Sequence, residues 1–357
     1  MHGKMKMQGS ARAAVNIVIL SFFALNANLD HLQGENLPRW LWPTPNTAFS
    51  AGRPLDAYIQ ATESGNPESG GFGCVREGDT RFHEGLDLKA VRHNRAGEAE
   101  DSVVAVFGGK VSYLNKVAGN STYGRYAVIE HDQVVPSVYT LYAHLRSIDP
   151  GIGKGRRISA GQQVGVMGRS AAGYSIPRSR AHLHFEIGLR LSDRFQNWYR
   201  SKGFETPNQH GIWNGMNLVG TNPLKFYKFM KARPGATMGA YMDTLPTAFT
   251  LVVHARGTPD FVLRYPSLLP GGMLLNRNPA GWEIGFTACG LPKRWRALDE
   301  TELPSPFVDG RVVLLARYER HLKTCKCRQM ITETGGVPAI GAGLRRTLEI
   351  IFGFNPK

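Results

Sequence analysis

Residues 181–187, Ala-His-Leu-His-Phe-Glu-Ile, are the stretch that most narrows the fold of this 357-residue chain. Apolar and polar residues alternate along it, which is typical of a β-strand. Alternate side chains of a strand point to the same face, so His182 and His184 are expected on one side of a sheet. Two neighbouring imidazoles are costly to bury without a metal or hydrogen-bond partners. They are therefore a metal or catalytic pair, or two satisfied polar side chains on an open sheet face.

Two segments upstream carry further residues of the metal-ligand type. In residues 81–88, Arg-Phe-His-Glu-Gly-Leu-Asp-Leu, His83 and Asp87 converge on a metal if the chain bends between them. Gly85 permits such a bend. A helical His-Glu-x-x-His zinc motif fits poorly, because its second imidazole is missing and Gly85 disfavours a helix. An incidental surface turn is the other alternative. His144 ends a strand-like run, where a lone histidine is usually structural.

Short runs separated by turn residues predict an antiparallel sheet rather than βαβ units. The predicted strands are 103–107, 110–114, 126–130, 138–142, 161–167 and 181–189, with a tight hairpin turn at Gly108-Gly109. Later strands are predicted at 249–255, 261–265, 282–286, 312–318 and 348–352. The predicted fold class is mainly β, with an antiparallel-sheet domain followed by a second β-rich module.

The order of the motifs is far more specific than any one of them. His-x-x-x-Asp is followed by Gly-Gly-Lys, Tyr-Ala-His-Leu, Gly-Gln-x-Val-Gly-x-x-Gly and His-Leu-His-Phe-Glu. In this order the chain resembles the M23 family of peptidoglycan metalloendopeptidases, the lysostaphin-like, LytM-type group. The resemblance covers roughly residues 72–227 and includes Asn222-Pro223, where the family often closes its domain. The matching residues are His83, Gly85, Asp87, Gly108 to Val111, Tyr142 to Leu145, Gly161, Gln162, Val164, Gly165, Gly168 and His182 to Glu186.

The resemblance implies a role for each of five positions. His83, Asp87 and His184 match the family's zinc ligands, and such a set suits Zn²⁺ while leaving a fourth position for water. His144 and His182 match the two catalytic histidines that do not bind zinc. We expect His182 to act as base and His144 to stabilise the tetrahedral intermediate, a division that the sequence does not decide. The implied activity is zinc-dependent hydrolysis of amide bonds in peptidoglycan stem peptides or cross-bridges, by attack of a zinc-activated water.

Three segments depart from the family pattern. Residues 169–180 form a longer, basic loop, and residues 93–101 and 191–210 look like insertions. Such loops would form groove walls, so the choice of bond within peptidoglycan stays open. Glu84 and Glu186 are candidates for orienting the imidazoles, with an ordinary structural role as the alternative.

Two other functions are compatible with this fold. A catalytically silent wall-associated scaffold or amidase activator is expected to lack one or more of the five site residues, whereas all five are present. A zinc hydrolase that cuts extracellular proteins or Gly-rich peptides is not distinguished, because that preference lies in the groove loops.

Charge narrows the class of partner. Lys and Arg number 43 and Asp and Glu 28, which gives a formal net charge of +15. This surplus favours anionic partners such as wall polymer. Because the basic residues are scattered, with no run of five or more, we expect peptidoglycan and not nucleic acid as the partner.

The N-terminal segment predicts export. The apolar run 13–25 follows basic residues and is shorter than a comfortable membrane span, which is typical of a signal peptide. An uncleaved anchor is the alternative, because Leu25 is large for a cleavage after Ala27. We expect a signal peptide at 1–27 and a mature protein in the periplasm, cell envelope or extracellular space, without stable membrane insertion.

The remaining chain is divided into three segments. We expect a linker at 28–70, a zinc peptidase domain at 71–232, and a β-rich C-terminal module of unknown role at 233–357.

Four cysteines in an exported protein suggest disulfides. Cys325 and Cys327 are too close in sequence to pair with each other, so one of them bonded to Cys289 is the favoured pairing. A Cys-x-Cys zinc site with His321 is the alternative.

Overall fold

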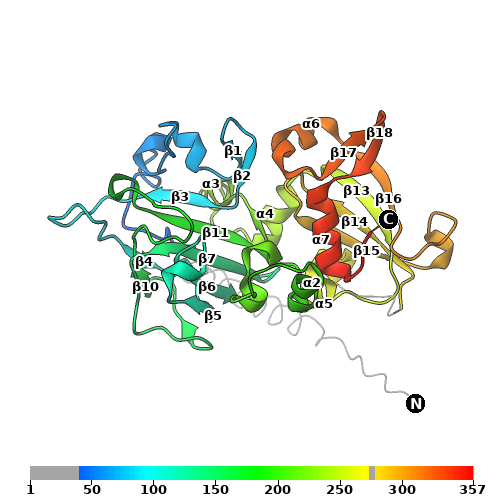
Figure 1. Cartoon of the computed structure of the whole chain (residues 1–357), viewed down its shortest axis with the longest axis horizontal. Helices are drawn as coiled ribbons and strands as arrows, with labels where there is room; N and C mark the ends of the chain where they lie inside the picture. The colour runs from blue at the N-terminus through cyan, green and yellow to red at the C-terminus, as the bar shows by residue number, and fades with distance from the viewer. Residues whose placement is uncertain (1–39, 273–277, 357) are drawn as a thin grey trace, which may run out of the picture. The chain divides into compact units, whose positions relative to one another are not determined.

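The computed structural model describes residues 40–272 and 278–356, drawn in colour in Figure 1. The predicted signal peptide at 1–27, the alternative membrane anchor and the first part of the predicted linker lie outside the described residues. No helix within the described ranges is long and apolar enough to cross a membrane.

A seven-stranded sheet contains most of the predicted motif strands (Figure 1). β11 pairs with β7 on one side, and on the other with β3 and then β12. Beyond β7 the order continues β6, β5, β9, and every pairing is antiparallel. The strands are β3 (Leu86–Lys89), β5 (Gly109–Asn115), β6 (Arg125–His131), β7 (Val138–Leu145), β9 (Arg157–Ile158), β11 (His182–Arg190) and β12 (Leu218–Thr221). The predicted fold class, mainly β and antiparallel, is confirmed.

β11 is buried along its whole length. Leu183 and Phe185 pack in the larger apolar core, whereas His182 and His184 point to the opposite face, as the period of a strand requires. A smaller apolar cluster that includes Trp213 packs within the sheet domain as well. The larger core therefore holds the histidine-bearing strand from one face, and the smaller cluster packs on the neighbouring strands β6 and β7.

A second, three-stranded sheet corrects one prediction. It has the order β4 (Ser102–Val104), β10 (Gln163–Val166), β8 (Ser147–Ile148). The hairpin expected at Gly108-Gly109 is wrong, because β4 pairs with β10 while β5 pairs with β6 and β9. A Cβ on Gly109 would lie 2.4 Å from the Glu130 carbonyl oxygen, so this glycine allows close strand packing instead of a turn.

The C-terminal region contains a four-stranded antiparallel sheet of order β15-β14-β13-β16 and a hairpin of β17 and β18. Its strands are β13 (Phe249–His254), β14 (Gly281–Phe286), β15 (Pro292–Leu298), β16 (Val312–Arg317), β17 (Ile331–Thr334) and β18 (Val337–Ile340). A β-rich C-terminal region is thus present, with β15 and the hairpin added to the predicted strands.

Two segments predicted as strands are helical. Residues 348–352 belong to helix α7 (Ala342–Phe352), in which Leu344, Leu348 and Ile351 are buried at helical spacing. Residues 261–265 overlap helix α5 (Asp260–Arg264), which begins after Pro259. A five-residue apolar window is compatible with both the helix period and the strand period. The residues that precede it therefore decide whether the segment is a helix or a strand.

Four further helices complete the described chain: α2 (Phe195–Ser201), α3 (Pro223–Ala232), α4 (Met238–Thr244) and α6 (Glu319–Leu322). The Asn222 side chain accepts a hydrogen bond from the Lys225 backbone and caps α3, and Pro223 occupies the first turn. Between α3 and α4 the chain turns at Pro234-Gly235, where Gly235 has a φ of +82°. The domain boundary predicted there stays a prediction.

The disulfide differs from the favoured pairing. Cys74 in β1 (Gly73–Arg76) bonds Cys327, which lies 253 residues away in the 3₁₀ segment Lys323–Arg328. Cys289 and Cys325 are free thiols, so the prediction of a Cys289 bond is wrong. The alternative Cys-x-Cys zinc site fails too, because Cys327 is consumed by the disulfide. The sequence prediction paired cysteines that are near one another along the chain, and nothing in the sequence indicates that β1 lies against the C-terminal region.

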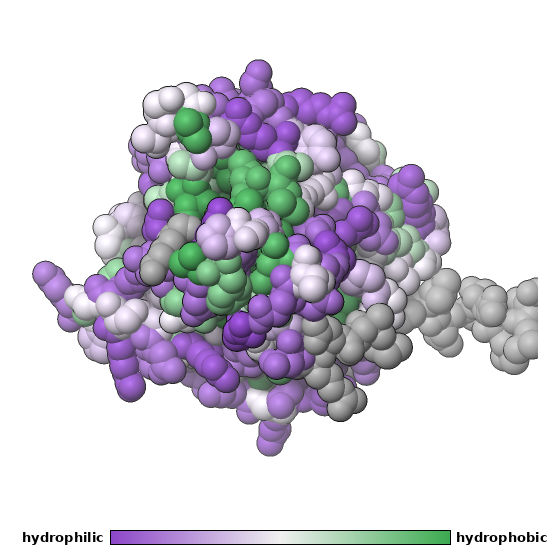
Figure 2. All heavy atoms as spheres, turned by 90° about the vertical axis from the view of Figure 1, so that its right-hand side faces the viewer, coloured by the Kyte–Doolittle hydropathy of each residue, from purple (hydrophilic) through white to green (hydrophobic). Residues whose placement is uncertain are grey.

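An apolar surface patch lies on the face of the molecule turned to the viewer in Figure 2. β16 is an edge strand of the C-terminal sheet, and the side chains of Leu315, Tyr318 and Val337 are 49%, 49% and 65% exposed in this region. Unpaired edges and exposed apolar side chains are features through which sheets associate. Leu315 lies on β16, Tyr318 directly follows β16, and Val337 lies on β18, so these side chains belong to the C-terminal region and not to the histidine-bearing sheet.

Loss of the disulfide is expected to destabilise the fold. Cys74→Ser should lower the free energy of unfolding by about 2–5 kcal/mol, because the bond closes a very long loop. Chemical unfolding under non-reducing conditions measures this change. Cys289→Ser, which leaves the bond intact, is the matched control and should cost much less. Equal losses in the two variants, or no Cys74–Cys327 peptide in a non-reducing digest, would contradict the pairing.

A second prediction concerns pH. His131 in β6 is fully buried, with its ring nitrogens bonded to the Gly108 carbonyl and the Thr140 hydroxyl, and burial lowers its pKa from 6.5 to about 4. The unfolded chain therefore binds this proton first, so stability is complete above pH 6.5 and is lost as pH falls toward 4. The loss at pH 5 should be about 2 kcal/mol.

Urea unfolding at pH 7 and pH 5 tests this dependence. His131→Gln should reduce the difference between the two pH values, whereas His93→Gln, at an exposed position, should preserve it. An unchanged difference in His131→Gln would refute the assignment.

Candidate metal centre and active site

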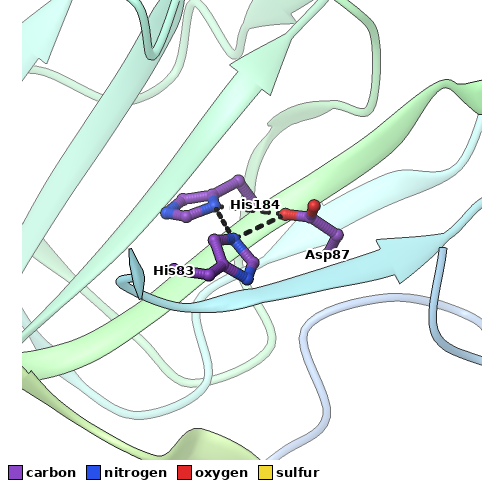
Figure 3. Close-up of side chains that lie close together, drawn as sticks. All are labelled: His83, Asp87 and His184. Atoms are coloured by element: carbon purple, nitrogen blue, oxygen red, sulfur yellow. Dashed lines mark hydrogen bonds and ion pairs between the residues drawn. The ribbon is translucent and has the colours of Figure 1, made fainter. Parts of the chain in front are cut away.

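Three ligand-type side chains meet at the junction of β2 (Arg81–His83), β3 and β11 (Figure 3). Strand register places Asp87 directly opposite His184. His83 Nε2 lies 3.0 Å from His184 Nδ1 and 3.1 Å from Asp87 Oδ1, and His184 Nδ1 lies 3.2 Å from the same oxygen. Each residue is at most 4% exposed. The cluster is thus closely packed and shielded from water.

The outer hydrogen bonds of the two imidazoles fix their tautomers. His83 Nδ1 must donate to the Gly71 carbonyl oxygen at 2.6 Å, because a carbonyl only accepts. His184 Nε2 lies 2.9 Å from Glu186 Oε1 and donates to that carboxylate. Glu186 also accepts from the Tyr123 and Tyr139 hydroxyls at 2.6 and 2.8 Å. The outer nitrogens therefore carry the protons, and the inner nitrogens present lone pairs.

A positive charge is required where these lone pairs meet. A proton on His184 Nδ1 supplies this charge when no metal ion is bound: burial by itself lowers the pKa of His184, but hydrogen bonds to Asp87 and Glu186 outweigh it and raise the pKa to about 9. Burial disfavours the charged form of Asp87, yet electrostatic interaction with His83 and His182 and the hydrogen bond from His184 hold its pKa well below the usual value.

A divalent cation meets the same requirement. Tetrahedral zinc with Zn–N bonds of about 2.0–2.1 Å separates its ligand atoms by roughly 3.3 Å. The three inner atoms are 3.0–3.2 Å apart, and the three residues together form a group able to hold a metal ion. The donor set and its spacing fit zinc.

His182 and His144 stand beside this cluster. His182 Nδ1 donates to the Arg180 carbonyl at 2.7 Å, and its Nε2 lies 3.5 Å from Asp87 Oδ1. His144 Nδ1 donates to the Ser170 carbonyl at 2.8 Å, and its ring centre is 4.9 Å from that of His182. Burial lowers the pKa of both histidines. Each is thus a neutral imidazole whose Nε2 is free to accept a proton.

Unusual backbone conformations position His144 and the segment between His83 and Asp87. His144 has a φ of +58°, uncommon for a residue other than glycine, and its N–H donates to the Tyr123 carbonyl. A Cβ on Gly85 would lie 2.3 Å from the Phe185 carbonyl oxygen, so only glycine lets the β2–β3 connection pack against β11. The bend predicted between His83 and Asp87 is present.

The cluster opens onto a cavity of about 1290 Å³. Its walls include residues of the predicted loops 169–180 and 191–210, such as Tyr174 and His210. Glu84 lines it without contacting an imidazole, whereas Glu186 orients His184. The remaining loop, residues 93–101, supports the wall indirectly, through Glu98 bonded to Arg169 and Arg178 of the basic loop.

Sequence reasoning missed several contributors to the site. Arg76 forms an ion pair with Asp87, and Arg328 and Arg346 reach the cavity from the C-terminal region. Tyr139 completes the hydrogen bonds of Glu186. None of these residues belongs to a motif. For Tyr139, the one signal in the sequence was the strand-like alternation around it and around Glu186, which lie on the paired strands β7 and β11.

The contribution of Glu186 can be tested directly. Glu186→Gln keeps the shape but weakens the acceptor that orients His184, so divalent-metal affinity should fall about 10- to 100-fold. Competition with a chromogenic chelator measures this affinity. Glu84→Gln is the matched control and should leave it unchanged, because Glu84 makes no such bond. Equal affinity in Glu186→Gln and the native protein would show that the tautomer is held by other means.

Comparison with known proteins identifies this region. The model of peptidase family M23 matches residues 81–196, which include all five site residues. A search of curated proteins finds no match.

Solved structures are similar over part of the chain. A zinc-containing peptidase from Vibrio cholerae is 28% identical, covering 42% of this chain and 37% of that one, with a TM-score of 0.28. A putative glycyl-glycine endopeptidase lytM from Ruminococcus gnavus is 27% identical over 32% and 43%, with a TM-score of 0.25. The catalytic domain of lysostaphin from Staphylococcus simulans is 20% identical over 49% and 95%, with a TM-score of 0.29.

This chain thus covers less than half the length of the first two proteins. With TM-scores this low, the assignment depends on the family model and the motif residues. Residues 81–196 of this chain are a peptidase family M23 domain.

Proposed function

We propose that this protein is a zinc-dependent endopeptidase that hydrolyses amide bonds in peptidoglycan stem peptides or cross-bridges. The observation that carries the proposal is the convergence of His83, Asp87 and His184, with lone pairs directed inward and protons held outward. Membership of the M23 peptidase family supports hydrolysis of peptide bonds. The division into a peptidase domain at 71–232 and a C-terminal module at 233–357 is part of the proposal, as is export by residues 1–27.

The mechanism assigns separate tasks to the five residues. His83, Asp87 and His184 would hold zinc, which polarises the scissile carbonyl and acidifies a water molecule. His182 is the base in this proposal, because its neutral Nε2 faces the ligand set at 3.5 Å from Asp87 Oδ1. His144 has its ring centre 4.9 Å from that of His182 and 5.9 Å from that of His184, and in this proposal it stabilises charge on the tetrahedral intermediate.

Two alternatives predict different behaviour. A silent scaffold or amidase activator would bind wall without cutting it, although all five site residues are present and buried together. A hydrolase of extracellular proteins would use the same chemistry on another substrate. Digestion of peptidoglycan, oligoglycine and a soluble protein side by side separates the three functions.

Substitution of a metal-binding residue should remove bound zinc, whereas substitution of a catalytic histidine should lower the rate and leave zinc bound. His184→Ala should lose both bound zinc and muropeptide release, whereas His182→Ala and His144→Ala should retain zinc and lose about 10²–10⁴-fold in rate. Elemental analysis and amine release from peptidoglycan measure the two properties. His93→Ala, at an exposed position, is the control. Zinc retained in His184→Ala, or native protein that binds zinc and cuts none of the substrates, would contradict the proposal.

A further inference from the structure

The C-terminal region supplies part of the wall around the histidine cluster. Arg328 ends the 3₁₀ segment Lys323–Arg328, and Arg346 and Thr347 lie on α7. All three line the same cavity as His83 and His184. This cavity is thus formed by two regions far apart in sequence, and two guanidinium groups come from the second.

These two guanidinium groups differ from the other arginines of the cavity. Arg76, Arg81 and Arg180 are paired with Asp87, Glu77 and Glu63, respectively. Within residues 40–272 and 278–356, no carboxylate forms an ion pair with Arg328 or Arg346. Two cations on a cavity wall therefore lack the anionic partner that their neighbours have.

Both groups are partly withdrawn from water. Arg328 stacks on Phe82, with its guanidinium carbon 4.6 Å from the ring centre, and its Nε is buried without a hydrogen-bond partner. Burial and the charge of Arg328 lower the pKa of Arg346, whereas the charge of Glu84 raises it. Glu84 lines the cavity but lies beyond ion-pair distance, so it offsets the charge only in part.

The position of the pair relative to the metal cluster is fixed. Phe82, beneath Arg328, is the neighbour of His83 on β2. Cys327, beside Arg328, is bonded to Cys74 on β1, and β1 pairs with β2 so that Cys74 lies opposite Phe82. On α7, Glu349 accepts from Trp198 at 3.0 Å and pairs with Lys202 at 2.6 Å. These bonds hold the arginines on the wall of the groove.

We propose that Arg328 and Arg346 form a carboxylate-binding subsite that selects anionic stem peptides over neutral substrates such as oligoglycine bridges. The inference rests on the proposed function and names its substrate class. The planar guanidinium fork matches a carboxylate in two-point contact, and shielding from water strengthens that contact. Stem peptides carry free carboxylates along their length, whereas the interior of a glycine bridge carries none.

Matched substrates test the subsite. We would compare a cross-linked stem-peptide dimer bearing its free carboxylates with the same dimer amidated at those groups. The native zinc-loaded protein should show kcat/KM roughly 10- to 100-fold higher for the carboxylate form. Arg346→Gln and Arg328→Gln should lose most of this preference by slowing the carboxylate substrate alone. Arg346→Lys should recover part of it.

Arg345→Gln is the control, because Arg345 adjoins Arg346 on α7 but bonds the C-terminal residues Asn355 and Pro356 and does not line the cavity. It should keep the full preference. Zinc content and thermal unfolding are measured in every variant to confirm folding. Equal rates on both substrates in the native protein, or the same loss on both in the arginine variants, would overturn the subsite.

Binding measurements separate this inference from the proposed function. Calorimetry of the two dimers reports the subsite without turnover. Carboxylate-dependent binding that disappears in Arg346→Gln, with no bond cut, would leave the subsite and refute the endopeptidase. Cleavage without carboxylate preference would support the endopeptidase and refute the subsite.

Discussion

The structure of the site depends on one electrostatic constraint, the meeting of three lone-pair donors whose side chains are almost wholly buried at the edge of the cavity. His83 and His184 each give their ring proton to an outer acceptor, so both direct a bare nitrogen toward Asp87. Such a cluster is unfavourable without a positive charge. The buried carboxylate Glu186 and its two tyrosine donors maintain this arrangement from the opposite side of His184.

The rest of the fold keeps these groups in register. β11 contributes His182, His184 and Glu186 from one face while its other face is fixed in the larger core. β3 brings Asp87 opposite His184, and Gly85 allows the chain to return close to β11. The C-terminal region then completes the cavity and is fastened by Cys74–Cys327. Core packing, strand register and the Cys74–Cys327 disulfide thus together keep the residues of one site in position.

Much of this could be predicted from sequence, because strand period is a local property. The His182–His184 pair, the antiparallel strands and the bend at Gly85 all follow from short patterns. Residues 261–265 and 348–352 were wrongly predicted because a short apolar window satisfies both helix and strand periods. The Cys74–Cys327 bond joins residues 253 positions apart, and the placement of Arg328 and Arg346 on the cavity wall likewise depends on contacts between distant segments, which no local pattern records.

Anomalous diffraction at the zinc absorption edge, from crystals of the purified protein, tests the central claim most directly. The account predicts one strong peak bonded to His83 Nε2, Asp87 Oδ1 and His184 Nδ1, with His182 and His144 outside bonding distance. A peak at another set of side chains would contradict it. Protein loaded with zinc that shows no peak between these three residues would contradict it as well.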